Sequence, residues 1–178
     1  YLLNTFKMKK TLFLLIIFII TLNSCSQSSS QKNEVTTYYF IRHAEKDRTD
    51  ESNKNPHLTA TGNLRAENWR TVFSNINFDM VFSTNFNRTI QTATPTAESK
   101  DLEIQFYNPK ELFNIDFQLK TKGKTVLVVG HSNTTPEFVN KVLGTEKYHD
   151  IDDNNNSNLY IITVSDNLKK DILLVIKN

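Results

Sequence analysis

An arginine and a histidine stand side by side at the end of an apolar run. Residues 39–41, Tyr-Phe-Ile, are followed directly by Arg42 and His43. Arginine is a permanent cation whose guanidinium matches phosphate oxygens bidentately, and a free imidazole, with a pKa near 6.5, is a nucleophile at neutral pH. The pair indicates phosphoryl-transfer chemistry, which needs both groups.

A second arginine and a second histidine occur downstream in matching contexts. Arg88 follows the apolar run 80–82, and His131 follows the run 126–129. Ligands of open α/β sheets bind where strand ends meet the following helices. We therefore expect Arg42, His43, Arg88 and His131 to open onto one edge of a sheet.

The residues around His131 add an anion-binding element to this edge. Gly130 permits close approach of the backbone, and a helix expected from Thr134 would point its N-terminal amides at an anion. Ser132 and Asn133, between His131 and that helix, are predicted to contact the substrate.

The intervening segments predict the elements that position these residues. Helical periodicity appears at Trp69, Val72, Phe73 and Ile76, and more weakly around Phe138. Six short runs rich in β-branched and aromatic residues are predicted strands: 37–41, 80–82, 104–106, 125–129, 159–164 and 172–176.

The resulting fold class is α/β, with three α/β/α layers around a mostly parallel central sheet. The run 126–129 is apolar without polar alternation, which is typical of a strand covered on both faces. With 178 residues, the chain is long enough for one core.

The N-terminal segment is predicted to be an export signal. In residues 1–24, Lys9 and Lys10 precede a short apolar run at 12–20, and Ser24 lies directly before Cys25; residues 1–7 precede a natural start at Met8. The apolar run is shorter than the roughly 20 residues that span a bilayer. A cleaved signal is therefore favoured over a permanent membrane helix.

Cys25 is predicted to carry a lipid anchor. Residues 22–25, Leu-Asn-Ser-Cys, resemble a bacterial lipobox, and no disulfide can form within the chain because Cys25 is its only cysteine. Residues 25–35 are predicted to be the lipidated cysteine with a flexible polar tether, and 36–178 the folded domain. We expect an exported domain, anchored by lipid to a bacterial membrane in the cell envelope.

The charge of the mature chain gives no reason to expect nucleic-acid binding. The sequence has 21 basic and 19 acidic residues, and three of the lysines precede Cys25, which leaves 18 against 19. The predicted domain is therefore near neutral, without the basic surplus typical of nucleic-acid-binding proteins.

Four ordered blocks resemble the histidine phosphatase superfamily, the phosphoglycerate-mutase-like group. The similarity extends from about residue 37 to 140. The blocks are Arg-His-Ala-Glu at 42–45, His-Leu-Thr-Ala-Thr-Gly at 57–62, Ser-Thr-Asn-Phe-Asn-Arg-Thr-Ile-Gln-Thr-Ala at 83–93 and Gly-His-Ser at 130–132.

The resemblance implies a phosphoglycerate-mutase-like fold and a covalent mechanism without a cofactor. His43 would attack phosphorus to form a phosphohistidine that water then hydrolyses, while Arg42, Arg88 and His131 surround the phosphoryl group. Such chemistry consists mainly of positioning and charge stabilisation. The expected substrates are phosphate monoesters of small molecules, or phosphoproteins, including protein phosphohistidine.

The proton donor to the leaving group is left with two candidates. Glu111 is the first, because many relatives carry their acid between the second and third blocks, and Glu45 is the alternative. Glu45 and Lys46 are also predicted to contact the substrate. The interval from Ala93 to Gly130 lacks a long substrate-covering insertion, so we expect a shallow, open pocket, which speaks against a phosphomutase.

Other interpretations of the same residues remain or fail on their spacing. A metal site that includes His57 and His149 is disfavoured, because no His-x-x-x-His or Cys-x-x-Cys spacing occurs and two arginines would repel a cation. A calcium loop at 150–161 lacks the required glycine and glutamate, so we interpret 150–158 as a solvated loop. An envelope lipoprotein that binds a phosphorylated ligand without turnover, or that has a purely structural role, remains an alternative.

Overall fold

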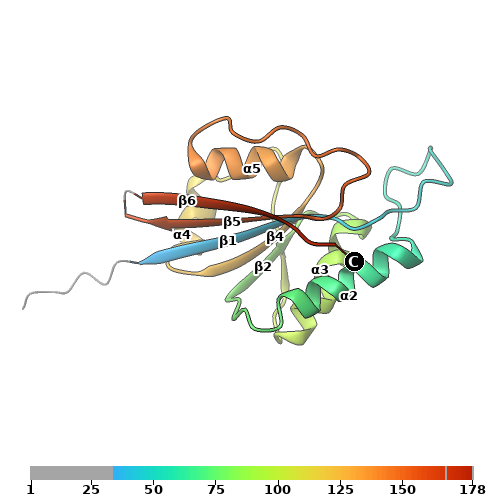
Figure 1. Ribbon diagram of the computed structural model, residues 1–178, viewed down its shortest axis with the longest axis horizontal. Coiled ribbons are helices and arrows are strands. Elements are labelled where there is room, and N and C mark those ends of the chain that lie inside the picture. Colours follow the sequence, from blue (N-terminus) through green and yellow to red (C-terminus); the bar gives the residue numbers. More distant parts are fainter. Residues whose placement is uncertain (1–33, 167, 178) are drawn as a thin grey trace, which may run out of the picture. The chain divides into compact units, whose positions relative to one another are not determined.

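The computed structural model describes residues 34–166 and 168–177 (Figure 1). The predicted signal segment, Cys25 and most of the predicted tether lie outside the described residues. Among the described residues, no helix is both long and apolar enough to cross a bilayer.

The described chain alternates strands and helices. The elements are β1 (Val35–Arg42), α2 (Ala60–Val72), β2 (Met80–Ser83), α3 (Asn87–Ser99), β3 (Ile104–Phe106), α4 (Ile115–Thr121), β4 (Thr125–Gly130), α5 (Thr134–Leu143), β5 (Asn158–Ser165) and β6 (Leu168–Val175). All six predicted strands are present, and β6 begins earlier than the predicted residue 172.

The strands form one mixed six-stranded sheet in the order β3-β2-β4-β1-β5-β6. The pairings β1 with β4, β2 with β4 and β2 with β3 are parallel, and β5 and β6 add to β1 as an antiparallel hairpin. The register sets Arg42 at the end of β1 beside Gly130 at the end of β4. The predicted meeting of these two strand ends is therefore confirmed.

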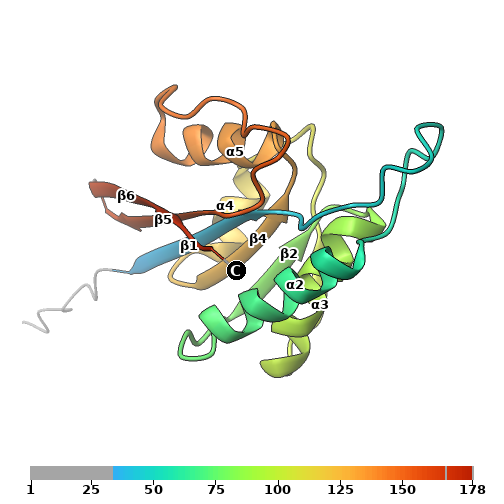
Figure 2. The ribbon, with the colours of Figure 1, turned by 45° about the vertical axis from the view of Figure 1, so that its right-hand side comes forward.

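Helices cover both faces of this sheet, as the apolar run 126–129 predicts. Phe40 and Val128 pack with Phe138 of α5 on one face, and Ile41 and Val129 pack with Trp69 of α2 on the other. Figures 1 and 2 show α4 and α5 on the first face and α2 and α3 on the second. The three-layer α/β/α architecture is thus confirmed.

The helices show where periodicity is a good guide and where it fails. Helix α5 contains the predicted apolar face around Phe138. Helix α2 ends at Val72, so the prediction that Ile76 continues it is wrong; Ile76 packs from the following turn, where its N–H donates to the Phe73 carbonyl at 2.9 Å. Helix α3 was not predicted, because the residues on its buried face are threonines and alanines rather than large apolar residues.

The edge strand β6 differs from the rest of the sheet. Its apolar side chains at 168 and 172–175 are all exposed, from 40% to 59%, whereas the neighbouring strand β5 buries Leu159, Tyr160 and Ile162. The protected core therefore ends at β5, and the predicted site residues lie at the carboxyl ends of the central parallel strands.

Candidate active site

The ends of β1, β2 and β4 bring the two predicted histidines and two predicted arginines to one cavity. The rings of His43 and His131 lie 5.5 Å apart between centroids. Both histidines, with Arg42 and Arg88, line a cavity of about 340 Å³. Strand topology explains this convergence, because Arg42 and Gly130 are paired in the parallel ladder and Arg88 lies in the first turn of the helix after β2.

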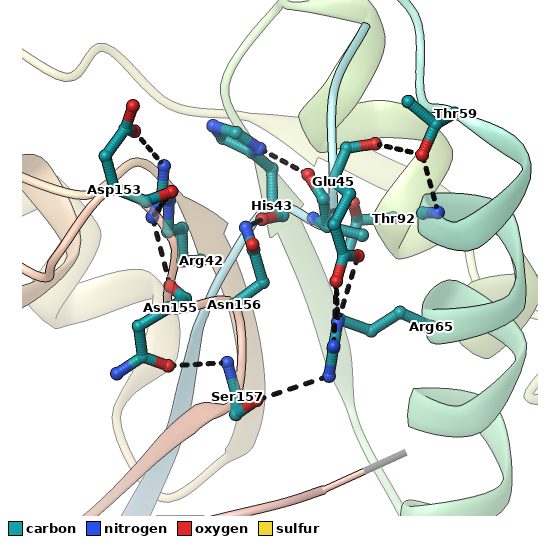
Figure 3. A network of polar contacts seen from close by, with 12 residues as sticks. Arg42, His43, Glu45, Thr59, Arg65, Thr92, Asp153, Asn155, Asn156 and Ser157 are labelled. Atoms are coloured by element: carbon teal, nitrogen blue, oxygen red, sulfur yellow. Dashed lines mark hydrogen bonds and ion pairs between the residues drawn. The ribbon is translucent and has the colours of Figure 1, made fainter.

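His43 is held in one tautomer by the backbone. Its Nδ1 lies 2.7 Å from the Ala44 carbonyl oxygen, which can only accept, so Nδ1 carries the proton and Nε2 keeps a free lone pair. The main chain is fixed as well: the His43 N–H donates to the Gly130 carbonyl at 2.9 Å, and the Asn156 amide donates to the His43 carbonyl at 2.8 Å (Figure 3).

The environment of His43 keeps its imidazole neutral. Burial, followed by the charges of Arg42 and Arg88, lowers the pKa of His43 to about 3, although the Ala44 hydrogen bond opposes the shift. A neutral ring with its unprotonated nitrogen free is the form of histidine that can attack phosphorus.

His131 is oriented by a chain of hydroxyls. Its Nε2 lies 2.9 Å from Thr84 Oγ1, and that oxygen contacts Thr89 Oγ1, which itself donates to a backbone carbonyl. Because the Thr89 hydroxyl donates to that carbonyl, it accepts from Thr84, and Thr84 in turn accepts from His131 Nε2–H. Nδ1 of His131 is therefore unprotonated and accepts from Arg88 Nη2 at 3.3 Å. Burial and the neighbouring charges, Arg88 foremost, lower the pKa of His131 to about 4.

Arg88 has donors that no described residue accepts. Its Nε and Nη1 are buried and have no hydrogen-bond partner among the described residues, while Nη2 contacts His131 and the guanidinium carbon lies 4.7 Å from the Phe86 ring centroid. A buried guanidinium N–H without an acceptor is costly. This arrangement suits an anion bound between Arg88 and the two histidines.

Arg42 is occupied very differently. Its side chain is 2% exposed, and its Nη1 donates to the carbonyl oxygens of Asp152, Asp153 and Asn155 at 2.8, 3.1 and 3.0 Å. Its Nη2 donates to the Asp153 carboxylate at 2.6 Å (Figure 3). Only Nε lacks a partner among the described residues. Arg42 therefore anchors the loop 150–157 against the cavity, and Nε is the nitrogen that it keeps unpaired.

Glu45 is the runner-up for the proton donor, and it is tied to Arg65. Its carboxylate accepts from Arg65 Nε at 2.8 and 3.0 Å and from Nη2 at 2.7 Å (Figure 3). Burial raises the pKa of Glu45, but the Arg65 hydrogen bonds outweigh it and leave the pKa below its ordinary value. Glu45 lines a smaller cavity of about 140 Å³ beside His43, where it is an ionised, paired group.

Three of the four remaining predicted residues line the main cavity, and the fourth, Glu111, does not. Lys46, Ser132 and Asn133 line the main cavity, and burial and nearby cations, Arg88 first, lower the pKa of Lys46. Glu111 is exposed and is not one of the lining residues, although Pro109 of the same loop is. Its role as proton donor stays a prediction.

Several residues that build the site were not predicted as functional. They are Arg65, Thr84, Thr92, Asp153 and Asn156. Two signals were present in the sequence, since Thr84 and Thr92 lie within the second family-like block. The interpretation of 150–158 as a solvated loop is wrong for its inner side, because Arg42 and His43 bind that loop through contacts more than 100 residues apart in sequence.

The described residues offer little to a metal ion. In the ranges 34–166 and 168–177 no group of three or more histidine, cysteine, aspartate or glutamate side chains lies close enough together to bind one.

Comparisons with known proteins agree with this geometry. Residues 38–118 match the sequence profile of the histidine phosphatase superfamily, branch 1. No curated protein sequence is significantly similar.

Many solved structures share the fold, three of which illustrate its range. The candidate phosphohistidine phosphatase SixA from Agrobacterium tumefaciens is 17% identical, with a TM-score of 0.59 over 79% of this chain and 98% of its own. A phosphoglycerate mutase from Bacillus anthracis is 18% identical, with a TM-score of 0.60 over 80% and 93%. A phosphoserine phosphatase variant from Entamoeba histolytica, in complex with phosphoserine, is 15% identical, with a TM-score of 0.57 over 73% and 94%.

Proposed function

We propose that this chain, whose residues 38–118 match the histidine phosphatase superfamily, is a phosphatase that hydrolyses phosphate monoesters through a phosphohistidine on His43. The observation that carries the proposal is the pairing, in one cavity, of a neutral imidazole whose Nε2 is free with an arginine whose buried donors are unpartnered. Phosphoryl transfer requires a nucleophile and donors for the phosphoryl oxygens.

The first half-reaction transfers the phosphoryl group to the enzyme. His43 Nε2 forms a bond to phosphorus while the bond from phosphorus to the ester oxygen breaks, and the leaving oxygen takes a proton. Arg88 Nε and Nη1 and Arg42 Nε donate to the phosphoryl oxygens. The Ala44 carbonyl stabilises the positive charge that develops on the imidazole, because it accepts from Nδ1–H at 2.7 Å.

The second half-reaction is hydrolysis of the phosphohistidine. Water attacks phosphorus, the phosphorus–nitrogen bond breaks, and His43 regains its lone pair while inorganic phosphate leaves. His131 Nδ1 lies within reach of Arg88, so a phosphoryl group held by Arg88 would lie beside His131 in both steps. The proposed substrates are small phosphate monoesters or phosphoproteins, including protein phosphohistidine.

Trapping of the covalent intermediate tests this mechanism. Acid-labile, alkali-stable radiolabel should accumulate on the wild type during turnover of a labelled phosphate monoester, and none should appear on H43A. H57A is the matched control, because His57 is exposed, is not one of the residues that line the cavity, and has its ring Nε2 3.3 Å from the Asn87 amide. Phosphate binding without label or turnover on a broad substrate panel would instead indicate a binding protein.

Glu111 is our proposed proton donor, since the carboxylate of Glu45 is bound by Arg65. The side chain would have to approach the cavity from the loop that carries Pro109. E111Q should hydrolyse an alkyl phosphate at least 10-fold more slowly while 4-nitrophenyl phosphate, whose leaving group needs no proton, is hydrolysed near the wild-type rate. Equal losses on both substrates would reject the assignment.

Localisation in the cell envelope through a lipid on Cys25 is a further proposal, supported by the signal-like segment 1–24 and the motif at 22–25. C25A should move the protein from the membrane fraction to the soluble fraction of the periplasm or medium. Retention of C25A in the membrane would contradict it.

A further inference from the structure

The carboxylate of Asp153 lies in the cavity wall and contacts Arg42, one of the arginines that we propose to bind phosphate. Its Oδ1 accepts from Arg42 Nη2 at 2.6 Å and its Oδ2 lies 2.7 Å from Arg48 Nη1. Asp153 and Arg42 both line the main cavity together with His43. The carboxylate is 63% exposed, although the arginine that it contacts is 2% exposed.

Arg42 has little left to offer a ligand while this contact persists. Three backbone carbonyls take Nη1, and Asp153 takes Nη2. A bidentate contact between a guanidinium and a phosphate uses two neighbouring nitrogens, here Nε and Nη2. Nε is free and one of the two N–H groups of Nη2 donates to Asp153, so a phosphate bound at this edge of Arg42 would share Nη2 with the Asp153 carboxylate.

We propose that Asp153 is an internal anion that competes with the substrate phosphate for the Nε–Nη2 edge of Arg42. The inference rests on the proposed function and adds to it a residue that sets phosphate affinity. When phosphate binds, it replaces the carboxylate at Nη2 and completes the bidentate contact through Nε.

The geometry allows phosphate to replace the Asp153 carboxylate at Arg42 with the loss of few other contacts. Asp153 uses different oxygens for its two arginines, so it can leave Arg42 and still keep Arg48. The loop does not depend on the carboxylate, because its carbonyls hold Arg42 Nη1 independently. Both arginines lower the pKa of Asp153, to about 2, so at neutral pH the competing group is a full negative charge.

Calorimetric titration with inorganic phosphate tests the competition without turnover. D153N removes the charge, and D153A removes the acceptor as well, so phosphate should bind about fivefold more tightly to D153N and more tightly still to D153A. D152N is the matched control: it removes one negative charge from the adjacent residue, whose Oδ1 accepts from Asn154 N and contacts neither arginine.

Salt separates local exchange from long-range attraction. At about 0.5 M NaCl, screening suppresses charge effects that act through solvent, so D152N should bind phosphate like the wild type, while the D153N gain persists. A crystal structure with vanadate on His43 should show the Asp153 carboxylate away from Arg42 Nη2 and two vanadate oxygens within hydrogen-bond distance of Nε and Nη2.

Unchanged or weaker phosphate binding by both D153N and D153A would overturn the competition and make Asp153 a structural residue. So would equal gains in D152N and D153N at high salt, because the effect would then be one of net charge. If the wild type binds neither phosphate nor vanadate, the proposed function fails, and the competition fails with it.

Discussion

Arg42 and Arg88 are the two arginines of the cavity, yet their surroundings are opposites. Arg42 is fully inside the protein and gives four of its hydrogen bonds to the loop 150–157. Arg88 contacts one histidine and one aromatic ring, and its buried Nε and Nη1 lack acceptors among the described residues. The same residue type therefore holds the site together in one place and lines the cavity with unpaired donors in the other.

The difference between the two arginines shows that a motif arginine cannot be assigned to phosphate binding from its sequence position alone. Arg42 adjoins the proposed nucleophile in sequence, but most of its donors are used to fix a distant loop. Arg88 is far from His43 in sequence and has the larger unused donor capacity. We expect substitutions to separate these two roles as loss of stability and loss of activity.

Substitution of Arg88 should have the largest effect, and it should be on activity. R88M removes the donors that we assign to the phosphoryl oxygens, so kcat/KM for a phosphate monoester should fall about 1,000-fold. The free energy of unfolding should change by less than ~1 kcal/mol, because few bonds in the protein are lost. R70M is the control, since Arg70 is exposed and forms an ion pair with Glu67 on the surface of α2. A large loss of stability in R88M would erase the contrast.

Substitution of Arg42 should mainly lower stability. R42M leaves the carbonyls of residues 152, 153 and 155 without their common donor and removes the partner of the Asp153 carboxylate. We expect a loss of about 3 kcal/mol in the free energy of unfolding, measured by urea denaturation. R48M is the control, because Arg48 is 51% exposed and meets the same carboxylate from outside. A loss below ~1 kcal/mol in the free energy of unfolding of R42M would show that the loop 150–157 is stable without its contacts to Arg42.

Gly62, in the first turn of α2, packs against the backbone that follows His43. A Cβ on Gly62 would lie 2.2 Å from the Glu45 carbonyl oxygen, so G62A must push helix α2 away from Glu45. We expect a loss of about 2 kcal/mol in stability together with a drop in kcat. The neighbouring substitution N63A, on the exposed side of α2, should do neither. A normal kcat in G62A would show that His43 does not depend on this packing.

The lowered pKa values of the two histidines should make stability depend on pH, an effect smaller than those of the substitutions above. The pKa values of His43 and His131 in the fold, about 3 and about 4, lie below the ordinary value of 6.5. The unfolded chain therefore binds protons that the folded chain does not, and stability is lost as pH falls from about 7 toward the folded values.

This loss should amount to about 1 kcal/mol between pH 7 and pH 6. Urea denaturation at each pH measures it, and the H131Q variant should show a shallower dependence than the wild type. A flat profile over this interval would mean that the two imidazoles are not kept neutral by the fold.

The residues that frame the site can be predicted from the sequence, whereas the contacts that hold them in place cannot. His43, Arg88 and His131 could be expected to meet because each follows a strand whose apolar run is visible, and parallel strand ends converge. The contacts of Arg42 could not be predicted, since a run of aspartates and asparagines at 150–158 carries no signal that its carbonyls turn inward. Helix α3 was hidden for a related reason: threonine and alanine make a tightly packed helix face without a large apolar stripe.

The wrapping of Arg42 also governs when during folding the site can exist. Arg42 ends the first strand, whereas its acceptors lie 110 to 113 residues further along the chain. Closing so long a loop is entropically costly and slow, because nonlocal contacts must wait for most of the chain to be ordered. Until the segment after α5 docks, a buried cation has no partners. The central sheet can therefore assemble before the protein is able to act, and catalytic competence is expected to be among the last properties that the folding chain acquires.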